Sequence, residues 1–402
     1  MKSKTLTLLI VFAMCCIQGI QAQKRTNNIT IIISLDGFRW DYPQMYRCPN
    51  IDKIGKDGVE AEVTPCYPAS TYPNHYSIAT GLYPDHHGIV SNTFYCKDNR
   101  TFYKMSDLYK PKALQQYGGE PIWITANRQG VKSGTIYWIG SEFQIKGFFP
   151  TYFERWSKTP HLSFQKRADK VLELLTMPEG TRPQLIMCYF EEPDHTGHLY
   201  GPQCRDIGTQ IAELDNIIGD LWKKIKTLPI GDRVNLIVTS DHGTAAISDH
   251  TCILIKKYLK KKWYNEIAVA IPTNIYTKPE YRDTVYEELK KVEHVQVWKK
   301  EEVPEHLHYG THPNCGDIIV APDKGYNCVN YLPHLYGEHG YDPTERDMHV
   351  IFKACGPDFK KGYKQPDFYN VDIYPLLCNL LGIKPAKNDG DIKRVKGMLK
   401  GN

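Results

Sequence analysis

Three apolar runs of the chain each lead into an aspartate, and this repeated arrangement constrains the fold more than any other feature. The runs cover residues 28–35, 185–190 and 234–239, and they lead into Asp36, Asp194 and Asp241. Nearly continuous runs of aliphatic and β-branched residues are typical of strands that are buried on both faces of a sheet. Ligands bind at the carboxyl ends of the strands in an open α/β sheet. We therefore expect the three aspartates to meet at one ligand-binding edge.

Amphipathic segments separate the apolar runs. The clearest covers residues 206–226, where apolar side chains recur three and four residues apart and form one helical stripe. Shorter helices are expected at 167–177, 281–292 and 373–381, and further strands at 134–138, 317–320 and 349–354. This alternation predicts an α/β fold with a mostly parallel sheet that is sandwiched by helices.

Residues 249–331 are less regular, and we expect them to form an insertion or a small subdomain. The lysine-rich run at 256–262 within it is interpreted as a solvated face rather than as a phosphate-binding patch. The formal net charge of the chain is only +5, without a clustered basic stripe, which argues against specific nucleic-acid binding.

Residues 1–22 are typical of a secretory signal, because Lys2 and Lys4 precede an apolar stretch and residues 20–22 offer a small-residue cleavage site. We predict an exported protein, extracellular or periplasmic, with residues 23–402 as a single domain. A membrane anchor through residues 6–20 is the alternative, although that stretch is short for a bilayer span.

Cysteine usage agrees with export. Of 12 cysteines, Cys15 and Cys16 lie in the signal segment, and the even number that remains permits disulfides without indicating their pairing. Cys188 and Cys378 lie in apolar runs and are expected to be buried thiols.

The stretch 66–92 is rich in hydroxyl, imidazole, proline and glycine, which is typical of a site rather than of a core element. Thr71 lies two residues before Pro73, and proline is favoured in the first turn of a helix. Thr71 would then lie where free backbone N–H groups and the helix dipole favour an anion. From this stretch alone, Thr71 is as readily a helix N-cap as a functional hydroxyl.

Six further polar side chains are expected at the ligand edge. They are Asp36, Asp194, His198, Asp241, His242 and His339. A single aspartate after a strand is usually a turn residue, but three carboxylates and three imidazoles without a thiolate suit zinc. Six ligands exceed the three or so that one catalytic zinc takes, so they suit two zinc ions. Such a pair supports in-line phosphoryl displacement, with Thr71 as the attacking oxygen.

Six motifs follow one another in a characteristic order. They are residues 34–39, 71–83, 87–89, 191–194 with 197–202, 240–243 and 339–341. Together they resemble the nucleotide pyrophosphatase/phosphodiesterase family of the alkaline phosphatase superfamily, over residues 31 to about 381. The resemblance implies an alkaline-phosphatase-like α/β catalytic domain in which the 249–331 insertion follows the fourth metal-ligand motif.

The resemblance also implies how the polar residues are used. By match to the family motifs, one zinc ion would be held by Asp36, Thr71, Asp241 and His242, and the other by Asp194, His198 and His339. Thr71 would attack phosphorus and form a phosphothreonine intermediate, and Asn92 would donate a hydrogen bond to a phosphate oxygen. The implied activity is zinc-dependent hydrolysis of nucleotide phosphodiester and pyrophosphate bonds, which releases nucleoside 5′-monophosphates.

Aromatic residues carry the implied substrate contacts. In similar enzymes the nucleobase is sandwiched between two rings, for which Tyr72 and Trp156 are the candidates, and Tyr189 matches a family tyrosine near the phosphate. The residues alone leave Trp156 open as an ordinary core side chain. Thr93 stands where several family members carry lysine, so a charge near the nucleotide is missing.

Two other functions compete with nucleotide hydrolysis. A lipid or choline-type phosphodiesterase is the nearest, because the family includes such members. A catalytically silent surface protein that binds nucleotides is the other, but such a protein would be free to lose metal ligands, and all seven are present here.

Overall fold

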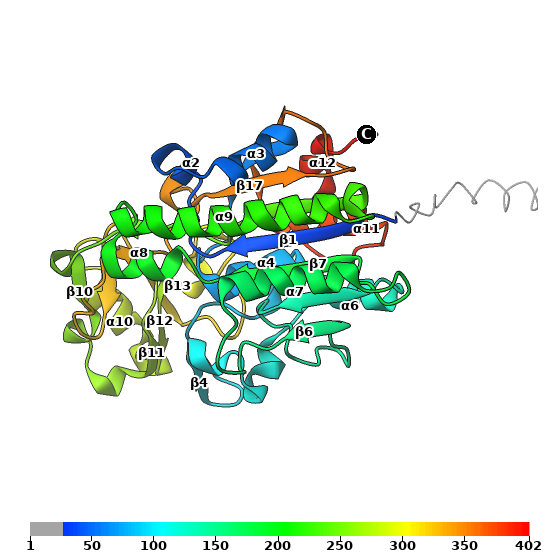
Figure 1. Cartoon of the computed structure of the whole chain (residues 1–402). Helices are drawn as coiled ribbons and strands as arrows, with labels where there is room; N and C mark the ends of the chain where they lie inside the picture. The colour runs from blue at the N-terminus through cyan, green and yellow to red at the C-terminus, as the bar shows by residue number, and fades with distance from the viewer. Residues whose placement is uncertain (1–26, 402) are drawn as a thin grey trace, which may run out of the picture.

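The computed structural model describes residues 27–401, so the predicted signal segment lies outside the described residues. A nine-stranded sheet forms the centre of the molecule (Figure 1). Its strands are β1 (Ile29–Leu35), β2 (Val59–Thr64), β5 (Ser133–Ile136), β6 (Tyr152–Glu154), β7 (Leu185–Phe190), β8 (Val234–Thr239), β17 (Val350–Cys355), β18 (Tyr363–Lys364) and β19 (Phe368–Tyr369). They are ordered β18-β2-β17-β8-β1-β7-β5-β6, with β19 beside β2.

The central strands of the sheet are parallel. β1 lies between β7 and β8 and is parallel to both, and β5 is parallel to β7 and β6. β17 runs antiparallel to β8 and β2. All residues of β1, β7 and β8 are buried, as the continuous apolar runs indicate. The predicted mostly parallel α/β sheet is confirmed.

Helices cover both faces of the sheet. The α-helices are α2 (Tyr42–Met45), α3 (Pro49–Asp57), α4 (Thr71–Thr80), α5 (Pro84–His87), α6 (Ile122–Arg128), α7 (Phe164–Thr176), α8 (Asp194–Tyr200), α9 (Arg205–Thr227), α10 (Arg282–Leu289), α11 (Ile373–Leu381) and α12 (Ile392–Val395). Ile31 and Ile33 pack in the cluster that contains α3, α7 and α9. Ile32 belongs to the opposite cluster, with α4, α6 and α11.

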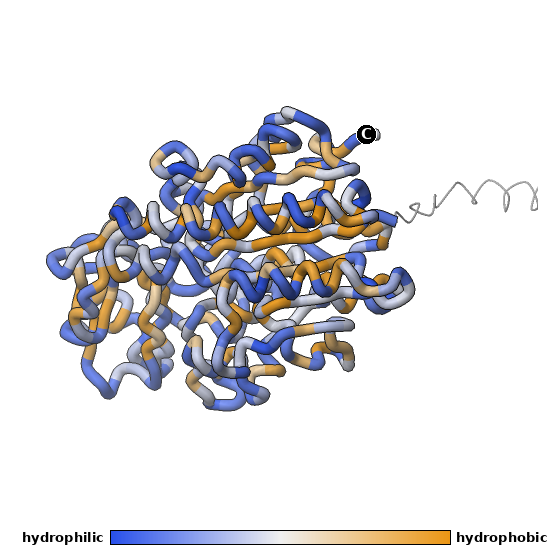
Figure 2. The backbone as a smooth tube through the Cα atoms, viewed as in Figure 1, coloured by the Kyte–Doolittle hydropathy of each residue, from blue (hydrophilic) through white to orange (hydrophobic). Residues whose placement is uncertain are grey.

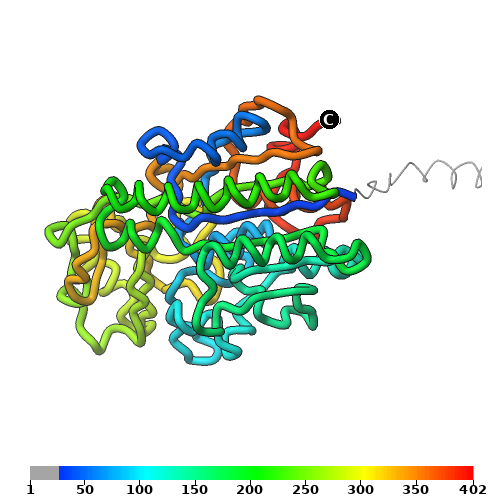
Figure 3. Tube along the Cα trace, in the orientation of Figure 1, coloured from blue at the N-terminus to red at the C-terminus, as the bar shows by residue number. Residues whose placement is uncertain are grey.

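The layers place β1 in the interior and α9 on the surface. β1 lies in the middle of the molecule, although it is the first element of the described chain (Figure 3). Hydrophobic residues follow β1 along its length, whereas α9 alternates between hydrophobic and hydrophilic residues (Figure 2). α9 is therefore a surface helix that buries one stripe, as the spacing of its apolar residues predicts.

Several boundaries differ from the sequence predictions. α7 begins earlier, at Phe164, because the Ser163 side chain accepts a hydrogen bond from the Lys166 N–H and caps the helix. β5 ends at Ile136 rather than at residue 138, since Tyr137 has a φ of 60°, which does not belong to a strand. α10 is shorter than predicted and ends at Leu289.

A smaller sheet lies within the irregular segment 249–331. β11 (Tyr264–Ala268), β12 (Thr273–Thr277), β14 (Ile318–Pro322) and β13 (Val295–Lys299) form it in that order, and neighbours are antiparallel. It has its own hydrophobic cluster with α10. The lysines of 256–262 are exposed, in agreement with a solvated face.

Three short strand pairs complete the fold. They are β3 (Phe94–Cys96) with β4 (Thr101–Tyr103), β9 (Ala245–Ala246) with β16 (Gly337–Glu338), and β10 (Cys252–Leu254) with β15 (Asn327–Val329). Between residues 27 and 401, no helix is both long and apolar enough to cross a bilayer. The cysteines of this region are free thiols, and Cys188 and Cys378 are buried as expected.

Candidate active site

The three aspartates lie together at the carboxyl edge of the sheet. Asp36 and Asp241 follow the adjacent strands β1 and β8, and Asp194 is the first residue of α8. The Asp194 N–H donates to the Asp36 carbonyl oxygen at 3.0 Å, which joins the end of β1 to the start of α8. Gly37 makes this approach possible, because it has a φ of +69° and a Cβ there would lie 2.9 Å from the Asp194 Cα.

Imidazole groups from distant segments meet these carboxylates. His242 Nε2 lies 3.2 Å from Asp36 Oδ1 and 3.2 Å from Asp241 Oδ2. His198 Nε2 is 3.3 Å from Asp194 Oδ2, and His339 Nε2 is 3.8 Å from Asp194 Oδ1. The six side chains expected at the edge are thus brought together; we call them the ligand cluster.

Three carboxylate oxygens in the ligand cluster lack a hydrogen-bond partner although they are buried. They are Asp36 Oδ1, Asp194 Oδ1 and Asp241 Oδ2. An unpaired buried carboxylate oxygen costs much free energy unless a cation or donor satisfies it. One such oxygen comes from each of the three aspartates, as expected of groups that share bound cations.

The three histidines are held in the orientation that metal ligation requires. His198 Nδ1 donates to the Gly337 carbonyl at 2.8 Å, His242 Nδ1 to Gly243 at 2.9 Å, and His339 Nδ1 to Ala69 at 3.0 Å. A carbonyl only accepts, so each Nδ1 carries a proton, and each Nε2, which faces the carboxylates, offers a lone pair when its ring is neutral. The residues present therefore fit metal ions, and a set of nitrogen and oxygen donors suits zinc.

Burial governs the protonation of the ligand cluster. It raises the pKa of Asp36 well above its usual value, and it raises the pKa of Asp241 to about 8, with the charge of Asp194 adding to the effect. Burial also lowers the pKa of His242 and of His339. Burial would raise the pKa of Asp194 as well, but the neighbouring His198, His339 and His242 together outweigh it and lower that pKa. Bound cations would offset the burial of these carboxylates and keep them ionised.

Thr71 is the first residue of α4, and Ser70 occupies the N-cap position. The interpretation of Thr71 as the cap is therefore wrong. Its hydroxyl instead lies 3.1 Å from His242 Nε2, inside the ligand cluster. The start of the helix thus places the Thr71 oxygen at the carboxyl ends of the strands.

Two neighbours of Thr71 received no role from the sequence, although both lie in its motif. Asn74 is fully buried, and its amide nitrogen donates to the carbonyls of Pro68 and Ser70 at 2.8 and 3.0 Å, which holds the turn before α4. His75 lies one helical turn after Thr71, with its Nδ1 3.2 Å from Asp241 Oδ2 and its Nε2 2.9 Å from Ser34 Oγ. His75 thus links α4 to β1 and to an aspartate of the cluster.

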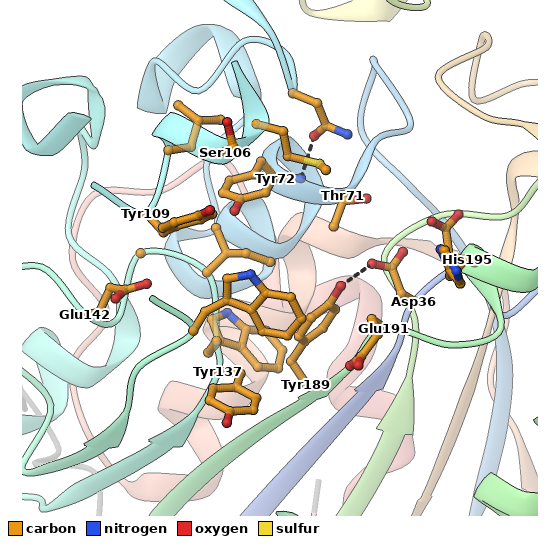
Figure 4. A pocket seen from close by; sticks show the side chains of 18 of the residues that line it. Asp36, Thr71, Tyr72, Ser106, Tyr109, Tyr137, Glu142, Tyr189, Glu191 and His195 are labelled. Carbon is orange, nitrogen blue, oxygen red and sulfur yellow. Dashed lines mark hydrogen bonds between the residues drawn. The ribbon is translucent and has the colours of Figure 1, made fainter. Parts of the chain in front are cut away.

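Asn92 and Tyr189 lie beside the ligand cluster. Asn92 Oδ1 accepts the Tyr72 N–H at 2.9 Å (Figure 4), so its amide nitrogen is left to donate to a ligand. The Tyr189 hydroxyl donates to Asp36 Oδ2 at 2.6 Å. Tyr189 therefore holds the side chain of Asp36, a candidate metal ligand, in addition to lying near the expected phosphate position.

A cavity of about 410 Å³ opens from the ligand cluster. Its aromatic lining consists of Tyr72, Tyr109, Tyr117, Tyr137, Trp138, Trp156 and Tyr189, accompanied by the carboxylates of Glu142 and Glu191. Thr71 and Asp36 lie at one end of this aromatic cavity, and Tyr109 and Glu142 lie at the other (Figure 4). Trp156 therefore lines a cavity while it also packs edge-on against Tyr137.

Arg167 supports the wall of the aromatic cavity from behind. Its guanidinium is 1% exposed, and it donates to the Tyr189 carbonyl at 3.0 Å and to Glu191 Oε1 at 2.9 Å. It also lies 4.8 Å from the ring centre of Tyr137 and 5.9 Å from that of Trp156. One buried cation thus orders four residues of the wall.

A second cavity, of about 370 Å³, adjoins the ligand cluster and the aromatic cavity. The two cavities share Asn92, Met105, His198 and His339. The walls of the second cavity come mainly from residues 269–271 and 327–339. Sequence reasoning did not find this cavity, because its two walls lie far apart in the chain.

Comparison with known proteins shows which proteins this chain resembles. The family model described as type I phosphodiesterase / nucleotide pyrophosphatase matches residues 30–342. The chain is 34% identical over 405 residues to human ectonucleotide pyrophosphatase/phosphodiesterase family member 5, which covers 99% of this chain and 84% of that protein. It is also 34% identical over 406 residues to a bis(5′-adenosyl)-triphosphatase of Xenopus laevis, covering 97% of this chain and 86% of that protein.

Solved structures give the same result. The murine ectonucleotide pyrophosphatase/phosphodiesterase 5, solved as an inactive threonine-to-alanine variant in complex with AMP, superposes with a TM-score of 0.87. The two chains are 34% identical, and the match covers 93% of this chain and 100% of the murine one. The human protein of the same type also superposes with a TM-score of 0.87.

Proposed function

The chain belongs to the type I phosphodiesterase / nucleotide pyrophosphatase family, and from this premise we propose that it hydrolyses nucleotide phosphodiester and pyrophosphate bonds with Thr71 as the nucleophile. As a member of this family it is a phosphoric diester hydrolase. The proposed products are a nucleoside 5′-monophosphate and the group released from it.

One observation carries the proposal. The hydroxyl of Thr71 lies 3.1 Å from His242 Nε2, among three buried carboxylate oxygens that have no hydrogen-bond partner. In the proposed assignment, Asp36, Thr71, Asp241 and His242 hold one zinc ion, and Asp194, His198 and His339 hold the other. When bound, the two ions supply positive charge that activates the attacking oxygen and stabilises the departing one.

The residues of this chain perform the other steps. The Thr71 oxygen forms a bond to phosphorus while the bond from phosphorus to the leaving oxygen breaks, which gives a phosphothreonine. Water then cleaves that ester, releases the monophosphate and restores the Thr71 hydroxyl. Asn92 donates its free amide N–H to a phosphate oxygen throughout, and its fixed orientation on the Tyr72 N–H keeps that donor in place.

The aromatic cavity suits the nucleoside half of the substrate. Base stacking on an aromatic side chain contributes about 1–3 kcal/mol and tolerates different bases. We assign Tyr72 and Trp156 to the base, since both line the cavity that opens from Thr71. The murine relative was solved in complex with AMP, which supports a nucleotide as ligand.

The experiment that tests this function replaces Thr71. We expect Thr71→Ala to abolish release of p-nitrophenol from thymidine 5′-monophosphate p-nitrophenyl ester, while metal analysis still finds two zinc ions per chain. Thr71→Ser is the matched control, because it keeps a hydroxyl and should retain part of the activity. Full turnover by Thr71→Ala would exclude Thr71 as the nucleophile.

A choline-type phosphodiesterase is the second candidate, and the same cavity favours it in one respect. Aromatic rings together with the carboxylates of Glu142 and Glu191 are groups that also bind quaternary ammonium ions. Turnover of p-nitrophenylphosphorylcholine and of the thymidine ester by one sample decides between them. We expect the thymidine ester to be preferred, and a preference for the choline ester would reverse the assignment.

We also propose that the enzyme acts after export, with residues 1–22 removed. The secretory pattern of that segment supports this location. Amino-terminal sequencing of the protein from the medium or periplasm of expressing cells should begin near Gln23, and retention of Met1 in the membrane fraction would favour the anchor instead.

A further inference from the structure

The second cavity lies where the departing half of a substrate would go. It shares Asn92, His198 and His339 with the aromatic cavity, so the two cavities meet beside the proposed phosphate position. A phosphodiester has two organic arms. If the aromatic cavity holds the retained nucleoside, the other arm extends into the second cavity.

The lining of the second cavity is largely apolar. Its apolar members are Met105, Val269, Ala270, Ile271, Val329, Pro333 and Leu335. Thr93, Asn327 and Asn330 are neutral, and no lysine or arginine is among the lining residues that the structure describes. Apart from the zinc ion proposed at His198 and His339, several negative charges on a polyphosphate would therefore find no fixed cation on these walls.

The one carboxylate on the walls is that of Glu338. It lies on β16, is half-buried, and accepts hydrogen bonds at 3.3 Å from Asn327 Nδ2 and from the His339 N–H. Its oxygen and the ring nitrogens of His198 and His339 all lie within 4.8 Å of one another. A negative charge is thus held beside the ligand cluster on the side of the departing group.

An exposed ring stands at the mouth of this cavity. Tyr331 lines the cavity, yet it is 74% exposed. A tyrosine that gains so little from packing in the free protein offers a flat apolar surface to a ligand. A second nucleoside has the matching flat ring and no charge.

From these features, and resting on the proposed function, we propose that the second cavity is the leaving-group subsite and that Glu338 selects against polyphosphate leaving groups in favour of uncharged ones with a flat ring, such as a nucleoside. With a dinucleoside monophosphate, the bond from phosphorus to the 3′ oxygen breaks as the Thr71 oxygen bonds to phosphorus. The 3′ oxygen takes up one proton as the Thr71 hydroxyl gives one up. No additional negative charge then enters the cavity, whereas ATP would release pyrophosphate beside Glu338.

Two substrates isolate the leaving group, because both place AMP in the aromatic cavity. ATP leaves pyrophosphate, and adenylyl-(3′→5′)-adenosine leaves adenosine. The measured quantity is the ratio of kcat/KM for ATP to kcat/KM for the dinucleoside, which removes effects common to both. We expect Glu338→Gln to raise this ratio about tenfold and Glu338→Lys to raise it further. A tenfold change corresponds to about 1.4 kcal/mol, which is the order of the repulsion between two nearby like charges in water.

Glu287→Gln is the matched control. Glu287 is exposed on α10 of the same inserted segment and lines neither cavity. It carries the same change of charge, so the ratio should stay at its wild-type value. A similar rise in this variant would mean that net charge, rather than the position of Glu338, controls the preference.

Binding to a variant without the nucleophile gives a readout that does not depend on turnover. In Thr71→Ala protein loaded with zinc, calorimetry should show tighter ATP binding when Glu338→Gln is added, and a smaller change for the dinucleoside. Metal analysis should find the same zinc content with and without Glu338→Gln. An unchanged ratio, equal effects on both substrates, or a loss of zinc would overturn the inference, and the last result would make Glu338 a metal ligand. Failure of the wild-type enzyme to release AMP from either substrate would instead overturn the proposed function.

Discussion

The two cavities that meet at the ligand cluster differ in how their walls are built. The aromatic cavity has seven rings, and the buried guanidinium of Arg167 orders its wall. The second cavity has largely apolar walls from two segments of the chain, a carboxylate beside the cluster and a ring that is mostly in solvent. The walls of the aromatic cavity are ordered by their own contacts in the free protein, whereas the ring of Tyr331 in the second cavity is exposed to solvent.

This difference separates two properties of the enzyme. In the proposed function, contacts with the nucleoside that is retained through both steps are made in the aromatic cavity, so they should act on every substrate with the same nucleotide. Contacts in the second cavity act only on the first step, because the departing group has left before water attacks. Variants of the two cavities should therefore be distinguishable by the use of substrates that differ only in their leaving group.

Removal of the metal ions should have the largest effect, since both cavities meet at the ligand cluster. We expect dialysis against a chelator to reduce hydrolysis of ATP and of adenylyl-(3′→5′)-adenosine to background, and zinc to restore both. The melting temperature should also fall, because three buried carboxylate oxygens lose their counter-charge. Undiminished activity in a sample shown to be free of metal would contradict the assignment of the cluster.

Asn92 is shared by the cavities, so its replacement should weaken both reactions. We expect Asn92→Ala to lower kcat about 100-fold for each substrate, the loss typical of one preorganised donor to a transition-state oxygen. Asn92→Asp still accepts the Tyr72 N–H but cannot donate to phosphate. If Asn92→Asp retained wild-type kcat, the role of Asn92 would be structural.

Replacement of Trp156 should weaken substrate binding in the aromatic cavity alone, because Trp156 does not line the second cavity. We expect Trp156→Ala to raise KM by a factor of roughly 5 to 150, corresponding to the ~1–3 kcal/mol of one base stack. The factor should be the same for ATP and the dinucleoside, and Trp156→Phe should recover most of the loss. Unequal factors would show that the two cavities do not divide the substrate as described.

Tyr331 should give the smallest effect and the most selective one. Because its ring is 74% exposed, we expect Tyr331→Ala to lower kcat/KM for the dinucleoside only about fivefold, near the lower end for a stacked base. ATP, which leaves pyrophosphate, should be unaffected. Tyr258 is also exposed and lines neither cavity, so Tyr258→Ala serves as the control.

The central sheet and the members of the ligand cluster were predictable from sequence because their signals are local. Continuous apolar runs indicate strands buried on both faces, and the residue that follows such a strand lies at a known edge. β7, β8 and α11 accordingly match the predicted ranges. Local signals left open whether Thr71 caps α4, and the structure shows that Ser70 is the cap. They placed the end of β5 too late, because the backbone of Tyr137 ends that strand early.

The second cavity was not predictable in this way. Glu338 was visible in the motif around His339, and residues 269–271 lay in a segment interpreted only as an insertion. Neither position has a periodic pattern, and their proximity follows from the packing of the inserted sheet against the cluster. His75 was missed for a similar reason, since its contacts are with Ser34 and Asp241.

The chemistry of this protein is thus a property of its sequence, because residue type and position after a buried strand are encoded over a few neighbouring residues. Its selectivity is a property of the tertiary structure. The carbonyl of Gly337, which orients His198, and the carbonyl of Ala69, which orients His339, lie far from these histidines in the sequence. The two segments that form the walls of the second cavity are also far apart in the chain. Such contacts arise only when separate segments pack together, since hydrogen bonds and burial depend on distance in space rather than on separation in sequence.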